Sequence, residues 1–426
     1  MIRRFRFLAL FAALALIAAA CGGDDSSDTT AAPSATTTTA APATTTTAGG
    51  STDTTAAPTD TTPIIIGAAV DLSQNMAPFN TPANRAAEIM VERINDAGGV
   101  LGGRPLELRT LDATVEPDVV KATAIDLIDQ GAEILMVTCD FDFAFPAIQE
   151  AIQANILTVA PCIGTDAMGP NNLGEEGRIA FSFGDQAQDE GAVLAEFARD
   201  QGWETAVVVK NNLLIYFQDV VDAFAVRFEE AGGTVVATEE FTGFDGTIGS
   251  VVTAVANEEK DVIAISSGFD DLPAFVFGLR ALGDDTPIVC SWACDGTFWY
   301  QEGEPLNEFY YNTKVSLFGD DPNQDVQDFL AELTARGGPP ATAAWLGGAQ
   351  AVQAIAEAIE ATGGTDAAAM AAYLEGFDNK SLIMGEVTLN ADNHTVFGRP
   401  HRIMQVTDSM PAFLELRTAT SPADIR

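Results

Sequence analysis

The sequence is poor in several side chains on which protein functions depend. It has two histidines, 21 basic residues against 61 acidic ones, and a formal net charge of −40. Such a polyanion is not expected to bind nucleic acid or an anionic membrane by electrostatics, because both carry the same sign of charge. We interpret the acidic composition as a solvated surface suited to solubility.

Metal-binding and catalytic motifs are also missing from the sequence. The two histidines, His394 and His401, lie far from Cys290 and Cys294, which do not have the two-residue spacing of zinc knuckles. The sequence has no Gly-x-Ser-x-Gly elbow, no Gly-x-Gly-x-x-Gly after its first strand and no phosphate-binding Gly-Lys-Ser/Thr. We therefore predict no metal, no cofactor and no enzyme activity.

Only one long apolar run is present, at residues 7–20, and three arginines precede it. The run is short for a membrane-spanning helix and is typical of a secretory signal. Residues 17–21, Ile-Ala-Ala-Ala-Cys, resemble a bacterial lipobox. We predict that residues 1–20 are a signal peptide and that Cys21 is lipidated, which anchors an exported protein to the outer face of the cell membrane. The alternative is ordinary secretion after cleavage at an Ala-x-Ala site.

Residues 21–62 contain almost only Thr, Ala, Ser, Pro, Gly and Asp. Too few large apolar side chains are present to offset the entropy of ordering, so we predict a disordered stalk after the lipidated cysteine. The body that follows has roughly 355 residues, which is more than one hydrophobic core usually serves. Two lobes are therefore expected.

Short apolar runs alternate with amphipathic stretches along this body. In its first half we predict strands at 64–70, 106–111, 134–137 and 156–159, with helices at 83–97, from 117 and from about 144. The alternation restarts after about Phe183, with strands at 206–209, 234–237, 262–265 and 287–289 and helices between them. Three further helices are expected at 326–335, 341–361 and 367–374. The sequence therefore predicts an α/β fold with two doubly wound parallel sheets.

The turn after the first helix carries a signature. Residues 94–106, Ile-Asn-Asp-Ala-Gly-Gly-Val-Leu-Gly-Gly-Arg-Pro-Leu, resemble the Asn-x-x-Gly-Gly motif with following Gly-Arg of branched-chain amino-acid type ABC-transporter substrate-binding proteins. The similarity extends over most of the body. Ala160-Pro161 ends the fourth strand, Tyr216 begins a helix, and Asp295 precedes Gly296, as in that family.

The resemblance implies a type I periplasmic binding protein, in which two lobes joined by three crossover segments close on a ligand. It places the crossings near Phe183, 313–317 and 390–398. The N-lobe would comprise 63–184 plus 317–391, and the C-lobe 185–316 plus 392–420. The implied function is capture of a small solute by a monomer and its delivery to the membrane permease of an ABC importer. The alternative is a ligand-sensing lipoprotein that signals to a membrane receptor; an enzyme is disfavoured.

The same resemblance suggests the site residues. In the family a C-lobe tyrosine and acid hold the ligand's ammonium group, and Tyr216 and Asp295 match them. The loops that hold the carboxylate have lost their hydroxyl groups here, apart from Thr165, and Asp142 would repel a carboxylate. We therefore predict an apolar or aromatic ligand bearing an amine or a neutral amide. The candidate contact residues are Phe79, Phe141, Asp142, Phe143, Thr165, Tyr216, Phe269 and Asp295.

Four cysteines lie in the body, and an even number in an exported protein favours disulfides. Cys139 and Cys162 follow the third and fourth predicted strands, so a bridge between their loops is sterically possible. In the alternative pairing these two are free and only Cys290 and Cys294 are bridged.

Overall fold

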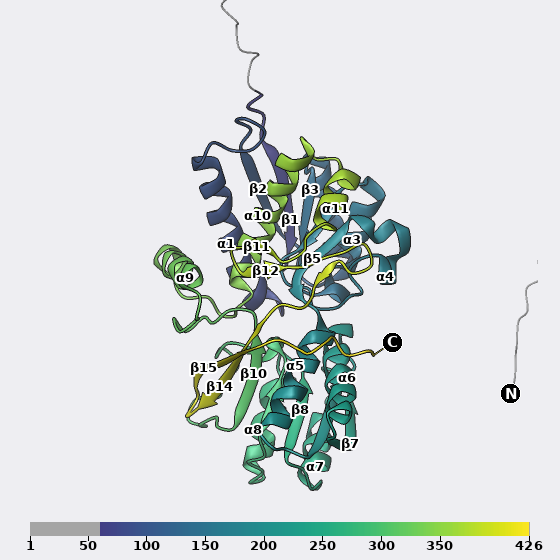
Figure 1. The fold of residues 1–426 in the computed structure, drawn as a ribbon, viewed down its shortest axis with the longest axis vertical. Helices are drawn as coiled ribbons and strands as arrows, with labels where there is room; N and C mark the ends of the chain where they lie inside the picture. The colour runs from purple at the N-terminus through teal and green to yellow at the C-terminus, as the bar shows by residue number, and fades with distance from the viewer. Residues whose placement is uncertain (1–59, 426) are drawn as a thin grey trace, which may run out of the picture. The chain divides into compact units, whose positions relative to one another are not determined.

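The structure is a computed structural model and describes residues 60–425. The predicted signal peptide, Cys21 and nearly all of the predicted stalk lie outside these residues. Within the described part of the chain, no helix is both long enough and apolar enough to cross a membrane. Figure 1 shows two sheets, each covered by helices, which are joined by segments near the middle of the view.

The first sheet has six strands, all paired in parallel. Their order is β13-β5-β4-β3-β1-β2. Three of its strands, at 64–70, 134–137 and 157–160, are largely buried apolar runs, as the sequence predicts for a sheet covered on both faces, whereas the strand at 106–112 is mostly half-buried. The strands are β1 (Ile64–Val70), β2 (Leu106–Asp112), β3 (Ile134–Val137), β4 (Leu157–Ala160), β5 (Ala180–Asp185) and β13 (Thr395–Val396).

Helices cover both faces of this sheet. The helices α1 and α10 pack together on one face with α11 beside α10, and α2 packs on α3 against the other. Two short helical segments, α4 and η1, precede β5, and α9 lies against α1. The bounds are α1 (Ala77–Asp96), α2 (Pro117–Asp129), α3 (Phe141–Ala154), α4 (Pro170–Leu173), η1 (Gly174–Ile179), α9 (Gln324–Gly337), α10 (Trp345–Thr362) and α11 (Ala367–Leu374).

The signature segment forms the turn from α1 into β2. Gly99 has a φ of +73°, and a Cβ atom there would lie 2.3 Å from the carbonyl oxygen of Arg104, so only glycine fits. The side-chain amide of Asn95 donates to the Leu106 carbonyl oxygen and accepts from the Leu106 N–H, at 2.9 and 2.8 Å. The motif therefore fixes a turn at the edge of the sheet.

The second sheet has seven strands in the order β15-β14-β10-β9-β8-β6-β7. The five from β6 to β10 are parallel, and the hairpin β14–β15 is added antiparallel at one edge. The strands are β6 (Thr205–Asn211), β7 (Thr234–Phe241), β8 (Val262–Ser266), β9 (Ile288–Cys290), β10 (Phe309–Thr313), β14 (His401–Thr407) and β15 (Met410–Arg417).

The helices α5 and α6 pack together on one face of the second sheet, and α7 packs on α8 against the other. In Figure 1 these four helices and the second sheet fill the lower half of the view. The bounds are α5 (Ala187–Asp200), α6 (Ile215–Glu230), α7 (Ile248–Ala256), α8 (Asp271–Ala281) and the short η2 (Trp292–Cys294); a separate hairpin is formed by β11 (Lys380–Leu382) and β12 (Gly385–Val387).

The chain passes between the sheets at three places. It leaves β5 of the first sheet at Asp185 and enters α5, it leaves β10 at Thr313, and it returns from β13 to β14 between Val396 and His401. Because β13 pairs with β5, residues 395 and 396 belong to the first sheet, and the third passage lies after them.

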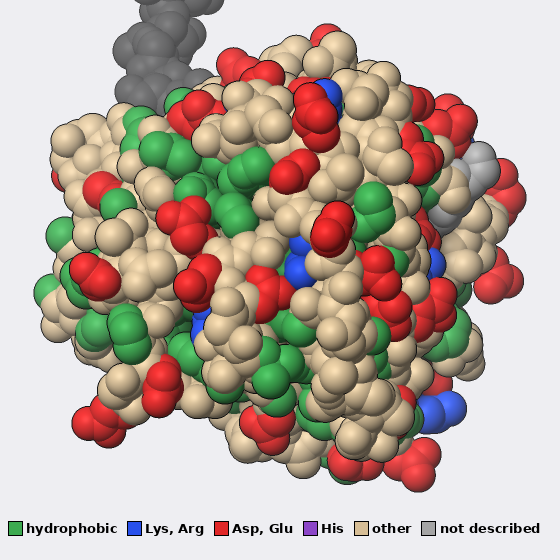
Figure 2. All heavy atoms as spheres, turned by 90° about the horizontal axis from the view of Figure 1, so that it is seen from below, with side chains coloured by type: hydrophobic (Ala, Val, Ile, Leu, Met, Phe, Trp, Pro, Cys, Tyr) green, Lys and Arg blue, Asp and Glu red, His purple; other side chains and the backbone are tan. Residues whose placement is uncertain are grey.

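Acidic side chains are spread over the surface. Figure 2 shows Asp and Glu scattered across the whole of one face, with few Lys or Arg among them. Several of the basic residues are instead engaged with acidic neighbours, for example Arg336 with Glu332 at 2.6 Å. The distribution fits a solvated acidic surface and forms no basic patch on this face.

Candidate functional site

A small cavity lies between the two sheets, at the carboxyl ends of their parallel strands. Its walls come from the segments that follow β1, β3, β6, β8 and β9. In both sheets the strand order reverses at this point, between β1 and β3 and between β6 and β8. Ligands of open α/β sheets bind at such switch points. The topology therefore marks this cavity as the candidate site.

Aromatic rings from both sides of the cleft form most of the wall. Phe79 of α1 meets Trp292 edge-on, with ring centroids 5.3 Å apart, and the rings of Tyr216 and Trp292 lie 5.9 Å apart. Phe217 and Phe269 extend the wall, with centroids 6.3 Å apart. Met76, Cys139, Asp140, Leu214, Gly268 and Ala293 complete the lining.

The two sides are in close contact, and the cavity between them is small. Its water-accessible volume is about 20 Å³, roughly the room that one water molecule needs. Ligand pockets are usually more than ten times larger. A solute the size of an amino acid therefore fits here only if the two sides move apart.

Among residues 60–425, Asp140 is the one acidic residue that lines this cavity. It caps α3, its side chain accepting from the Phe143 N–H at 3.2 Å, and it is only 5% exposed. Burial, followed by the nearby charge of Asp142, raises the pKa of Asp140 to about 7. The carboxyl group thus lies in an apolar wall and changes charge near neutral pH.

Other carboxylates occupy backbone donors at the edge of the cleft. Asp71, after β1, accepts from the N–H groups of Ser73, Gln74 and Met76 at 3.0, 2.8 and 2.7 Å. Asp142 of α3 accepts from the Ile215 N–H at 2.9 Å, at the first residue of α6. The N–H groups that an anionic ligand would use at these turns are already bonded.

The predicted contact residues lie in different environments. Phe79, Tyr216 and Phe269 line the cavity, whereas the other five do not. Phe141 is buried against Phe145 in the core under the first sheet, and Phe143 packs against Phe269 with ring centroids 6.4 Å apart. We expected a loop here, but α3 begins at Phe141, and its helical turn directs Asp140 to the cavity.

Asp142, Thr165 and Asp295 instead connect the two sides of the cleft. The Thr165 hydroxyl donates to Asp219 of α6 at 2.7 Å. The Asp142 carboxylate accepts from the first residue of the same helix. Asp295 accepts from the N–H of Ala343, just before α10. Burial raises the pKa of Asp295 to about 7. These contacts hold the sides of the cleft together.

Tyr216 leads from the cavity to a buried acid that the sequence did not indicate. Its hydroxyl donates to Glu190 of α5 at 2.8 Å, and a Cβ atom at Gly164 would lie 2.5 Å from the Tyr216 ring. Glu190 is fully buried and also accepts from Asn312 at 3.2 Å. Burial raises the pKa of Glu190 to about 8. Tyr216 is therefore fixed between a glycine and an acid.

Charged groups from all three passages between the sheets meet beside Glu190. Asp185 of the first passage accepts from Arg399 of the third, with Nε at 2.8 Å. Lys314 of the second passage donates to the Cys162 carbonyl oxygen at 3.3 Å and lies 4.3 Å from the Trp292 ring centroid. Burial opposes ionisation of Asp185, but Arg399 outweighs it together with smaller contributions from His401 and Lys314, so the pKa of Asp185 is lowered.

The histidine of this cluster gains a proton only in acid. Burial lowers the pKa of His401 to about 4. Its Nδ1 accepts from the Asn312 amide at 3.0 Å, which places the proton on Nε2. We call this set the hinge cluster: Asp185, Glu190, Asn312, Lys314, Arg399 and His401.

Two disulfides support the loops of the cleft. Cys139 is bonded to Cys162 and Cys290 to Cys294, with Cα atoms 4.8 and 6.1 Å apart. The predicted bridge between the third and fourth strands is confirmed, and the second pair is bridged as well. Cys139 lines the cavity, and η2 with Trp292 lies inside the loop that the second bridge closes. Both bridges therefore restrain cavity-lining residues.

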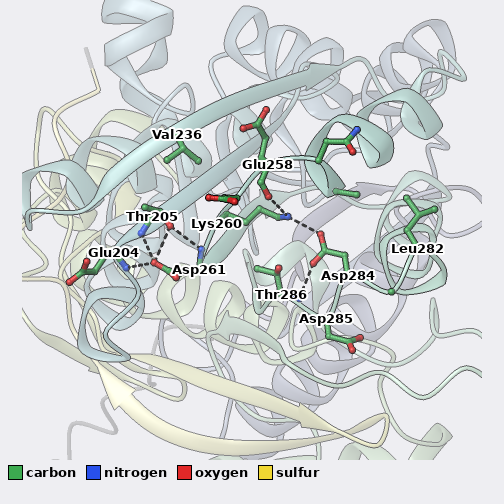
Figure 3. A pocket seen from close by; sticks show the side chains of 14 residues that line it. Glu204, Thr205, Val236, Glu258, Lys260, Asp261, Leu282, Asp284, Asp285 and Thr286 are labelled. Atoms are coloured by element: carbon green, nitrogen blue, oxygen red, sulfur yellow. Dashed lines mark hydrogen bonds and ion pairs between the residues drawn. The ribbon is translucent and has the colours of Figure 1, made fainter.

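A wider depression lies at the opposite, amino ends of the second sheet's strands (Figure 3). Its volume is about 1370 Å³, and its walls include Glu204, Asp261 and Asp284. These polar groups bond one another: Lys260 reaches Asp284 at 2.8 Å, and Asp261 accepts from the Glu204 N–H at 2.9 Å. The depression is large but open, and its polar groups already have hydrogen-bond partners within it. The smaller aromatic cavity is therefore the better candidate. Among residues 60–425 no group of three His, Cys, Asp or Glu side chains is placed to hold a metal.

Comparison with known proteins shows the family of the chain. A family model described as periplasmic binding protein matches residues 63–410. The chain belongs to this family. The resemblance noted at residues 94–106 is thereby confirmed.

Relatives of this periplasmic binding protein come from several bacteria. The Leu/Ile/Val-binding protein homolog 3 of Brucella melitensis is 24% identical over 317 residues, 72% of this chain and 82% of that protein. The structure of LivJ from Streptococcus pneumoniae with isoleucine has a TM-score of 0.72 and 18% identity, and the match covers 84% of this chain and 99% of that one. The structure of a solute-binding protein of Rhodopseudomonas palustris with benzoate has a TM-score of 0.70 and 18% identity, and the match covers 85% of this chain and 97% of that one. These structures show that the predicted type I fold is correct.

Proposed function

We propose that this protein captures a small, mainly apolar solute between its two sheets and delivers it to the membrane permease of an ABC importer. It would act as a monomer, held at the outer face of the membrane through a lipid on Cys21. The aromatic cavity at the switch points of both sheets is the observation that carries the proposal. The relatives' ligands, isoleucine and benzoate, are also small and largely apolar.

Capture would proceed by hinge motion of two lobes. We propose 63–184 plus 317–391 as the N-lobe and 185–316 plus 392–420 as the C-lobe, with residues 395 and 396 joining the N-lobe because they pair with β5. Contacts such as Asp142 with Ile215 would break on opening, while the hinge cluster would stay in place. Closure of this kind is the common mode of ligand capture in two-lobed binding proteins.

Thermal shift against amino acids, amides, amines, aromatic acids and polyamines tests this function. A ligand that binds only the folded state raises the melting temperature. We expect a hit to change the radius of gyration in small-angle X-ray scattering, because the two sides must move to admit it, and Trp292→Ala to abolish the thermal shift. Trp203→Ala is the matched control, because Trp203 packs on Phe197 away from the cavity. A panel without hits and with unchanged scattering would contradict the proposal.

A further inference from the structure

Few polar groups line the cavity, and its ionisable side chains are acids. Among the described residues that line it, Asp140 is the only ionisable side chain other than Tyr216, whose hydroxyl already bonds Glu190. None of these described lining residues is Lys, Arg or His. The remaining wall is aromatic or aliphatic, apart from Gly268 and the disulfide-bonded Cys139. A ligand inside this wall therefore meets one carboxyl group and several ring faces.

Several backbone donors around the cavity are already used. Asp140 takes the Phe143 N–H of α3, and Asp142 takes the Ile215 N–H of α6. The Cys139 N–H donates to Asn80 at 2.9 Å, and Asp71 binds the turn before α1. A carboxylate placed here would displace these bonds and approach Asp140 within a few ångströms, where like charges repel strongly.

Lys314 is a buried cation near the cavity, and acidic neighbours compensate its charge. The Lys314 ammonium group donates to the Cys162 carbonyl oxygen and faces the carboxyl groups of Asp185 and Glu190. Burial lowers the pKa of Lys314 to about 8. Lys314 does not line the cavity, so it offers no direct partner to an anion. The indole N–H of Trp292 has no hydrogen-bond partner among the described residues.

From these contacts we infer that Asp140 determines the ligand class. It selects a solute that presents N–H donors, an amine or an amide, from an apolar body, and it excludes free carboxylates, branched-chain amino acids among them. The aromatic rings contribute contact area and, for an amine, attraction of the cation to their faces. This inference rests on the proposed function and assigns to Asp140 the role that the sequence suggested for Asp295.

Two matched ligand series test the inference by calorimetry on the complete mature protein. They are benzylamine, benzamide and benzoate, and isopentylamine, leucinamide and leucine. We expect the amine or the amide to bind tightest in each series. Asp140→Asn keeps a residue that caps helices well, so the fold should remain. It should weaken amine binding by about 10- to 100-fold and strengthen benzoate binding by at least about tenfold, the range expected for a bond to a charged group.

A control variant separates the charge in the cavity from helix capping. Asp366 caps α11 in the same way, accepting from the Ala369 N–H at 2.9 Å, and Asp366→Asn should leave every affinity unchanged. Tight binding of leucine or benzoate to the wild type, unaffected by Asp140→Asn, would overturn the inference while keeping the proposed function. No binding by either series would also overturn it. The proposed function would fail only if the wider panel also gave no ligand and no closure.

Discussion

The ion pair between Asp185 and Arg399 should be the most sensitive point of the hinge. Both side chains are 2% exposed, and they join the first and third passages between the sheets. Arg399→Met would leave the Asp185 carboxylate buried without its bonded cation. Removal of one partner from a buried pair typically costs 3–5 kcal/mol. Because Lys314 still favours the ionised form of Asp185, we expect a loss near the lower limit, about 3 kcal/mol.

Urea unfolding followed by circular dichroism measures this loss at constant pH. The matched control is Arg336→Met, because Arg336 makes its ion pairs at the surface with 43% of its side chain exposed. That change should cost less than about 1 kcal/mol. In the double variant, Asp185→Asn should restore at least about half of the stability lost in Arg399→Met, since the unpaired charge is gone.

The reasoning about the hinge would be refuted by either of two results. A cost below about 1 kcal/mol for Arg399→Met would mean that water or Lys314 compensates Asp185 in full. Strictly additive costs of the two single changes would mean that the residues do not interact. Neither result would affect the assignment of the ligand cavity, which depends on other residues.

Three further outcomes are expected. Cys21→Ser should release the protein from membranes or leave its precursor uncleaved, and wild-type protein found soluble with an unmodified N-terminus would contradict the anchor. Because the pKa of Asp140 is raised to about 7, its ionised fraction grows from pH 6 to pH 8, and affinity for benzylamine should rise roughly tenfold over that range in the wild type but not in Asp140→Asn. The effect of pH on folding has the opposite sign, because the fold favours the protonated form of Asp140. The contribution of Asp140 to the free energy of unfolding is therefore complete below about pH 4 and is lost as the pH rises through about 7. Asp142→Asn weakens the bond to Ile215, so scattering should report a larger radius; an unchanged radius would show that this contact does not hold the cleft closed.

Most of the fold could be predicted from periodicity alone. The strands at 64–70, 134–137 and 262–265 are buried apolar runs, and β1, β3 and β8 match them within a residue. The hairpin β14–β15 escaped prediction because its outer strand is an edge strand, half exposed and without a continuous apolar run. The order of strands in each sheet depends on pairing between distant segments, which a single sequence does not encode locally.

The site was harder to predict because the residue at which each helix begins decides which side chains face the cavity. We expected α3 to begin at about residue 144, but it begins three residues earlier, at Phe141. As a result Asp140 lines the cavity and the predicted Phe141 and Phe143 do not. Glu190 gave no signal, since an acid in the first turn of a helix is ordinary on an exposed surface. Its burial follows from the packing of α5 on α6 beneath the cavity. Phe79 and Tyr216 were accessible through the family resemblance.

A crystal structure with the tightest-binding amine or amide of the two series would test the central claim most directly. We predict that the ligand lies between Phe79, Tyr216 and Trp292, with its nitrogen within about 3.2 Å of the Asp140 carboxylate. The two sides of the cleft should lie farther apart than in the present structure, since about 20 Å³ cannot hold such a molecule. A ligand bound elsewhere, for example in the open depression beside Asp261 and Asp284, or one that turns a carboxylate toward Asp140, would contradict the account.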